Sequence, residues 1–193
     1  HDLNDVIRIS IYLRDIMDLN AVEKVQASFF PTYQPARTVV AVEGLPQDAL
    51  VMVEALVDNG EGTQSVPQAG DLLKLTNNTH AAPYDACSTQ TVAFSHYNNI
   101  SAQLPVDLDG NLIAGGVAEQ TAQCLAYVKA IIESVEHDVD DIVKVNVFLA
   151  DMADLDAMND AYTAFFGDHK PARKVLGCGA LPMGARVMID AIA

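Results

Sequence analysis

Apolar and polar residues alternate with a period of two in residues 7–13 and again in residues 143–149. In the second stretch the apolar positions carry Val143, Val145, Val147 and Leu149, and the first stretch repeats the pattern with Ile7, Ile9, Ile11 and Leu13. Side chains in a β-strand point alternately to opposite faces, so this period predicts two strands that each have two different faces.

A helical period follows each alternating stretch. One face of the later segment carries Leu155, Met158, Tyr162 and Phe165. Asp154 stands where an N-cap is expected, and Asp18 holds the same place in the earlier segment. A third and longer helix is predicted at 118–136, with one apolar stripe made of Ala118, Ala122, Leu125, Val128, Ile132 and Val135. We expect that stripe to pack on a sheet.

The remaining apolar runs predict further strands. Residues 37–42 and 49–56, and likewise 173–178 and 185–192, are β-rich pairs separated by a Leu-Pro turn, and we expect each pair to form neighbouring antiparallel strands. Residues 91–105 hold two more short strand candidates. Strands and helices that follow one another in this way indicate an α+β fold.

The chain repeats itself. A shift of 136 residues places 1–56 on 137–192 without a gap, and 20 of the 56 pairs are identical. We interpret this as a tandem duplicate. Residues 1–57 would be the C-terminal half of a first unit (strand, helix, strand, strand), the Gly- and Gln-rich residues 58–71 a linker, and residues 72–193 a complete second unit.

A half unit presents a physical problem, because its sheet edge and its helix-binding face would be open to solvent. We therefore expect either that the natural chain continues upstream of His1 or that another chain covers these surfaces. Our hypothesis is that the two units act like two subunits of a pseudo-symmetric ring or a homo-oligomer.

Composition narrows the function. Half of the 193 residues are apolar, which is enough for a core, and the formal net charge of −15 disfavours nucleic-acid and anionic-membrane partners. No apolar run reaches the roughly 20 residues of a membrane span and no signal peptide is evident, so a cytoplasmic location is expected. The three cysteines predict free thiols, and neither a metal site nor a cofactor motif is predicted from the spacing of His, Cys and Gly.

Several motifs together resemble the reactive-intermediate deaminase (RidA or YjgF) family. They are the Pro-Tyr pair at Pro83, the stretches 101–116 and 143–166, the Pro-Ala-Arg motif that ends at Arg173, and the C-terminal stretch 181–193. The resemblance covers nearly all of 80–193 and, as a half copy, 1–56. It implies a chorismate-mutase-like fold, with a mixed sheet packed on two helices, and trimers that bind ligands in the clefts between subunits.

The resemblance also implies an activity and a site. Members hydrolyse small 2-imino acids or enamines to 2-keto acids and ammonia, and an arginine holds the substrate carboxylate. By position that role falls on Arg173, with Ser101 and Tyr84 as further catalytic residues. Arg37, Ala102 and Asn159 match substrate-binding positions, and the alternative for each arginine is a structural salt bridge at the start of its strand. A guanidinium suits this role because its planar fork matches a carboxylate bidentately.

This chain departs from the family pattern in ways that leave two function classes open. The family's water-holding glutamate is replaced by Met188 and Met52, and a thioether neither orients nor deprotonates water. Asp190 and Glu54 lie two residues further on, and Glu23 replaces Asn159 in the first unit. The sequence is therefore consistent with an imine deaminase or with a non-catalytic module that binds small carboxylates. Ribonuclease activity, also attributed to the family, is the least favoured by the net charge of −15.

Overall fold

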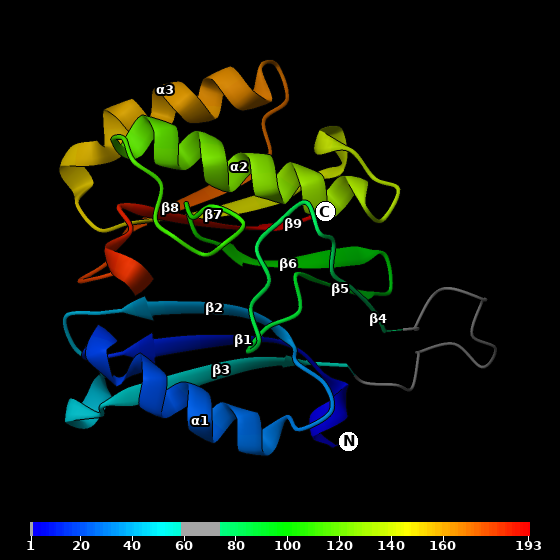
Figure 1. Ribbon diagram of the computed structural model, residues 1–193, viewed down its shortest axis with the longest axis vertical. Helices are drawn as coiled ribbons and strands as arrows, with labels where there is room; N and C mark the ends of the chain where they lie inside the picture. The colour runs from blue at the N-terminus through cyan, green and yellow to red at the C-terminus, as the bar shows by residue number, and fades with distance from the viewer. Residues whose placement is uncertain (1, 59–73) are drawn as a thin grey trace.

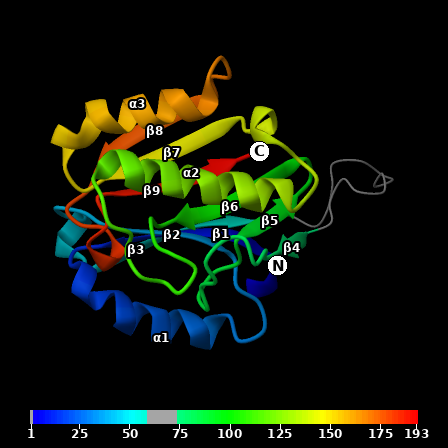
Figure 2. The same cartoon turned by 45° about the horizontal axis from the view of Figure 1, so that its top comes forward.

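The computed structural model describes residues 2–58 and 74–193 and arranges them in four layers (Figures 1 and 2). Two helices cover the outer face of a six-stranded sheet. The inner face of that sheet packs on a three-stranded sheet, which carries one helix on its own outer side (Figure 1). The predicted linker at 58–71 lies outside the described residues except for Asp58, so the domain boundaries stay predictions.

The N-terminal segment forms the three-stranded sheet and one helix. Its elements are β1 (Val6–Leu13), α1 (Leu19–Phe29), β2 (Ala36–Ala41) and β3 (Val51–Val57). The strand order is β2-β1-β3, with β1 parallel to β2 and antiparallel to β3. The strands predicted from the period-two pattern and from the β-rich runs are confirmed in this segment.

The C-terminal unit forms the six-stranded sheet and two helices. Its elements are β4 (Leu75–Asn77), β5 (Thr91–Phe94), β6 (Tyr97–Gln103), α2 (Val117–Glu133), β7 (Lys144–Leu149), α3 (Leu155–Phe166), β8 (Ala172–Gly177) and β9 (Val187–Ile192). The strand order is β4-β5-β6-β9-β7-β8. The expected α+β fold, with a mixed sheet packed on two helices, is confirmed.

The expectation that 173–178 and 185–192 are neighbouring antiparallel strands is wrong. The strand β7 lies between them, with Val147 paired to Val175 in parallel and to Ile189 in antiparallel. The reason is the crossover through α3, which returns the chain parallel to β7 on one edge. The turn at 182–184 then leads the chain to the other edge of β7. The N-terminal segment repeats this arrangement, with β1 between β2 and β3.

The sequence pattern suggested that Asp154 caps α3 and that Asp18 caps α1. In the structure neither side chain makes a capping hydrogen bond. Each helix is preceded by a short 3-10 turn, and the aspartate before that turn makes the cap. Asp151 accepts the backbone N–H of Ala153 at 2.9 Å, and Asp15 does the same for Met17 at 2.9 Å. The Asp154 carboxylate binds the guanidinium of Arg186 instead.

The two sheets are joined by an apolar contact and a buried ion pair. The apolar contact consists of Val40 from the N-terminal segment and Phe148, Leu181, Ala185 and Met188 from the C-terminal unit. Beside it, Arg8 of β1 forms a salt bridge with the buried carboxylate of Asp190, which also accepts a hydrogen bond of 2.8 Å from the Thr38 hydroxyl. These contacts hold the two segments in a defined relation, which matters because the cleft described below lies between them.

No helix among residues 2–58 and 74–193 combines the length and the apolar character that crossing a membrane requires.

Candidate functional site

A cleft of about 390 Å³ lies where the N-terminal segment meets the C-terminal unit. α1 and β2 form one wall, and the loop before β5 forms the other together with β6 and β9. The residues that matter for its chemistry are Glu23, Arg37, Tyr84, Asp85, Ala102 and Met188. One chain therefore builds a cleft from segments far apart in the sequence.

Arg37 is placed in this cleft by its strand and by Ser101. Its backbone N–H donates to the Ser101 hydroxyl at 2.8 Å, and that hydroxyl donates to the carbonyl of Thr89 at 2.6 Å. The Ser101 side chain, which is 2 % exposed, links the backbone of Arg37 to the backbone of Thr89. Ser101 thus connects β2 to the C-terminal unit from behind the cleft and positions Arg37.

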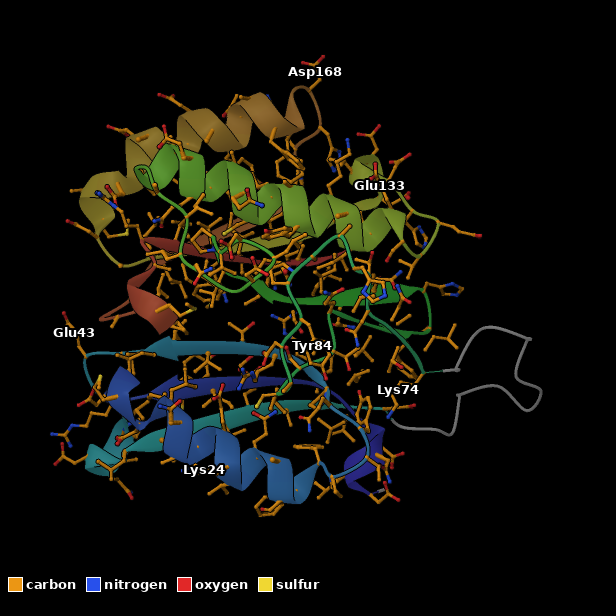
Figure 3. All side chains as sticks on the ribbon, viewed as in Figure 1. Lys24, Glu43, Lys74, Tyr84, Glu133 and Asp168 are labelled. Atoms are coloured by element: carbon orange, nitrogen blue, oxygen red, sulfur yellow. The ribbon has the colours of Figure 1, made fainter. Side chains whose placement is uncertain are left out.

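Tyr84 lies on a loop that reaches from the six-stranded sheet toward the three-stranded sheet (Figure 3). The side-chain amide of Gln90 fixes this loop by donating to the carbonyls of Ala82 and Pro83, both at 3.0 Å. The Tyr84 ring itself is 76 % exposed. It can therefore contact a ligand at the mouth of the cleft without any backbone change.

Ala102 lies where the pairing of β6 with β9 becomes irregular. The register shifts between Ile100 and Gln103, and such bulges re-aim side chains and leave backbone groups outside the ladder. Ala102 lines the cleft at this point. The irregularity thus brings the backbone of β6 to the cleft wall at Ala102. This residue occupies the position where the family has a glycine.

The guanidinium of Arg37 is surrounded by acceptors and is only 9 % exposed. Its Nη2 donates to Glu23 Oε1 at 2.9 Å and to Asp85 Oδ2 at 2.8 Å, and Nη1 donates to Gln26 Oε1 at 3.3 Å. The Ser88 hydroxyl donates to the same Asp85 oxygen at 2.7 Å. Asp85 was not singled out in the sequence, although it follows Tyr84 directly; its distance in sequence from Arg37 concealed their contact.

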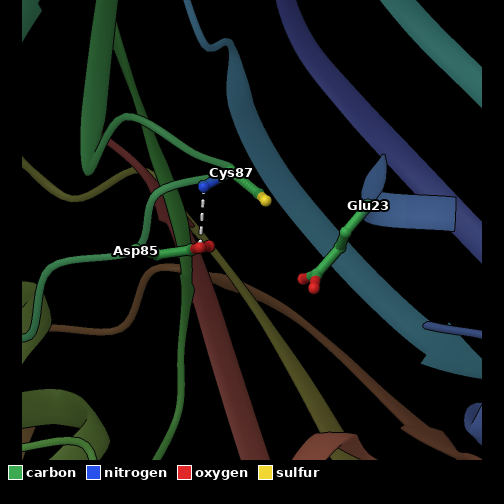
Figure 4. Close-up of side chains that lie close together, drawn as sticks. All are labelled: Glu23, Asp85 and Cys87. Carbon is green, nitrogen blue, oxygen red and sulfur yellow. Dashed lines mark hydrogen bonds between the residues drawn. The ribbon is translucent and has the colours of Figure 1, made fainter. Parts of the chain in front are cut away.

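Glu23, Asp85 and Cys87 come close together beside the cleft (Figure 4). One ligand atom of each lies within 4.8 Å of the others, which is close enough to surround a cation. The positive charge here already comes from Arg37. Burial raises the pKa of the Cys87 thiol, an effect that the nearby Arg37 charge opposes. The thiol is therefore a poor metal ligand at neutral pH.

Arg173 occupies a different place. It lies on β8 beside a hollow of about 220 Å³, where its Nη1 donates to Asn159 Oδ1 at 2.8 Å. Its guanidinium stands 4.7 Å from the centroid of the Tyr162 ring. Within one chain, the structure thus brings Arg37, Tyr84 and Ala102 together, with Ser101 behind them. Arg173 and Asn159 form a separate pair.

The two methionines that replace the family glutamate also differ in placement. Met188 is buried and lines the cleft, whereas Met52 is exposed on β3. Asp190, which lies on the same strand face as Met188, is held in the contact between the sheets by Arg8. Glu54 is exposed and lies 3.4 Å from the hydroxyl of Tyr12.

Comparison with known proteins gives a consistent result. A family profile described as Endoribonuclease L-PSP matches residues 1–58 and 79–193. A RutC family protein of Pyrococcus horikoshii is 36 % identical over 106 residues, which is 54 % of this chain and 84 % of the relative. A protein of Bos taurus named 2-iminobutanoate/2-iminopropanoate deaminase is 40 % identical over 106 residues, or 54 % of this chain and 77 % of the relative. The crystal structure of the YjgF gene product from E. coli aligns with a TM-score of 0.59 at 36 % identity, covering 62 % of this chain and 97 % of that one.

Proposed function

Because this chain belongs to the Endoribonuclease L-PSP family, we propose that its cleft binds a small 2-imino acid and hydrolyses it to a 2-keto acid and ammonia. Relatives named 2-iminobutanoate/2-iminopropanoate deaminase support this class of reaction. The observation that carries the proposal is the position of the Arg37 guanidinium in the cleft, beside Tyr84 and the irregular segment of β6.

The reaction requires little of the protein beyond the correct placement of the substrate and a water molecule. A water oxygen adds to the imine carbon, protons move to the nitrogen, and the C–N bond breaks to release ammonia and leave a carbonyl group. A protonated imine carbon is already electrophilic, so holding the acid and a water in line supplies much of the acceleration. Arg37 is the group in the cleft that can hold the substrate carboxylate.

Asp85 is our candidate for the group that takes the proton from water. Its carboxylate lines the cleft and has a fixed orientation, since the Cys87 N–H donates to Oδ1 at 2.9 Å and Ser88 donates to Oδ2. Met188, where the family has glutamate, offers no such acceptor. Asp85 comes from the loop before β5, in the same wall of the cleft as Met188 of β9, so it would supply the lost function from a neighbouring element.

A coupled assay tests the proposal. A pyridoxal-phosphate serine dehydratase generates the imine of pyruvate, and pyruvate release is followed with and without this protein. We expect an acceleration that Arg37→Ala lowers by about 10- to 100-fold, the loss expected for one charge-assisted contact. Arg173→Ala is the matched control, because it removes the same side chain at the repeat-equivalent position outside the cleft.

Two results would contradict the proposal. No acceleration over buffer by the unaltered protein would remove the deaminase activity. A loss confined to Arg173→Ala would move the site to the hollow beside Tyr162, where a second chain would have to complete it. The homo-oligomer or ring with sites between subunits stays a proposal, and sedimentation at several concentrations tests it.

Met188 favours a second candidate, a module that binds small carboxylates without catalysis. In that case 2-keto acids would bind in the cleft and Arg37→Ala would abolish binding, yet the coupled assay would show no acceleration. Ribonuclease activity is the least supported function, because the net charge of −15 repels a phosphate backbone.

A further inference from the structure

The charge around Arg37 is negative overall. Its single positive charge lies against two carboxylates, Glu23 at 2.9 Å and Asp85 at 2.8 Å. Both carboxylates lie in the cleft wall with Arg37. A ligand that enters therefore meets a guanidinium whose charge is more than balanced by its neighbours.

The second copy of the motif provides an internal reference. Arg173 corresponds to Arg37 at the shift of 136 residues, and its partner there is the neutral amide of Asn159, the residue equivalent to Glu23. The residue equivalent to Gln26 is Tyr162, whose ring lies beside the Arg173 guanidinium. The same strand and helix thus hold an arginine beside a neutral partner in one copy and beside anions in the other.

This difference decides which ligands suit the cleft. A guanidinium has five N–H donors, and three of those of Arg37 bind Glu23, Asp85 and Gln26, which leaves donors on Nη1 and Nε within the described part of the chain. A carboxylate can use these donors, but it is repelled by the two carboxylates already present. A cationic nitrogen on the atom next to the carboxylate would turn that repulsion into attraction.

We propose that Glu23 and Asp85 are specificity-determining residues that make the cleft select zwitterions, namely 2-imino acids in their protonated form and the matching α-amino acids, over 2-keto acids. The inference rests on the proposed function and extends it. In the reaction the positive charge leaves with the ammonium ion, so the substrate is a zwitterion and the 2-keto acid product is an anion. The two carboxylates would hold the more electrophilic form of the imine and favour release of the product.

A binding experiment with matched stable ligands tests this. L-2-aminobutanoate and 2-oxobutanoate share a carbon skeleton and a carboxylate, and they differ in the cationic nitrogen. Calorimetric titration of the full chain should show a preference of about tenfold or more for the amino acid, as expected for one ionic contact with partly buried carboxylates. Glu23→Gln should lower this preference about tenfold, by weaker binding of the amino acid and tighter binding of the keto acid.

Two further variants make the result specific. Glu23→Asn places at this position the residue that the second copy carries, and it should act like Glu23→Gln. Glu54→Gln changes the net charge by the same amount on the exposed strand β3 outside the cleft and should leave the preference unchanged. Circular dichroism of each variant checks that the fold is kept.

The inference is overturned if 2-oxobutanoate binds the unaltered protein as tightly as L-2-aminobutanoate does, if neither ligand binds, or if both Glu23 variants keep the original preference. The proposed function fails separately. Selective binding of the amino acid without acceleration in the coupled assay would retain the specificity and remove the deaminase. If the protein accelerates the reaction and Arg37→Ala abolishes that acceleration, but the two ligands bind equally well, the deaminase is retained and the specificity is removed.

Discussion

The N-terminal segment and the C-terminal unit share a strand-helix-strand-strand order and a pairing scheme, yet they bury their apolar faces to very different extents. Val187 and Ile189 of β9 are both 0 % exposed, whereas the equivalent Val51 and Val53 of β3 are 42 % and 57 % exposed. In the C-terminal unit α2 and β6 cover that strand. In the N-terminal segment the equivalent face borders an apolar hollow of about 590 Å³. Burial is therefore set by the elements that surround a strand and not by the strand's own sequence.

The two segments also differ in the ionic groups that face the contact between the sheets. Arg8 lies in that contact with the buried Asp190, while the equivalent residues Lys144 and Glu54 are exposed. The Arg8–Asp190 pair is therefore buried, whereas the equivalent charged residues, Lys144 and Glu54, are exposed to solvent. Both sets of charges line the same hollow between the sheets, so the same face of each segment turns inward and only the Arg8–Asp190 pair is closed off from solvent.

The largest effect on stability is expected from Arg8→Met. The substitution leaves the Asp190 carboxylate buried without its cation, which costs about 3 kcal/mol or more. Lys144→Met removes a cation at the repeat-equivalent, exposed position and should change the unfolding free energy by less than about 0.5 kcal/mol. Urea denaturation followed by circular dichroism measures both. Equal effects would show that the Arg8–Asp190 pair does not hold the segments together.

The sequence predicted those parts of the fold that local period determines. Strands at 7–13 and 143–149 and the long helix appear where alternation and helical spacing placed them. The expected stripe of that helix is only partly correct: Leu125, Val128 and Ile132 are buried, but Ala122 is exposed. The polar residues Gln120 and Thr121 are buried there, and Gln120 accepts the backbone N–H of Arg186 at 2.9 Å, a long-range contact that a polarity pattern does not detect.

What the sequence did not reveal depends on contacts between distant segments. The Pro-Ala-Arg motif identified two arginines, but it did not show that Arg37 shares a cleft with Tyr84 in one chain and that Arg173 does not. Likewise, Asp85 and Glu23 are far apart in sequence and come together around Arg37. Packing of one segment on the other determines these contacts.

A second substitution tests the comparison of the two apolar faces. Val187→Ala and Val51→Ala remove the same atoms at equivalent positions of the repeat. In the buried case the loss of apolar contact and the cavity left behind should cost about 2 kcal/mol, and in the exposed case less than about 0.5 kcal/mol. Thermal and urea unfolding of both variants measure the difference. A cost at Val51 as large as at Val187 would mean that the face of β3 is covered in solution.

The smallest effect is expected at Arg186. Its guanidinium binds the Asp154 carboxylate at the start of α3, and the equivalent residues in the N-terminal segment, Leu50 and Asp18, lack this charge pairing. Arg186→Leu therefore installs the residue of the other copy. Because the Asp154 carboxylate is nearly buried while the arginine is half exposed, we expect a small loss of unfolding free energy that decreases further as salt is added. Urea denaturation at low and high ionic strength measures it. A loss that does not respond to salt would point to packing of the arginine stem in place of its charge, and the two helix starts would then differ in shape and not in electrostatics.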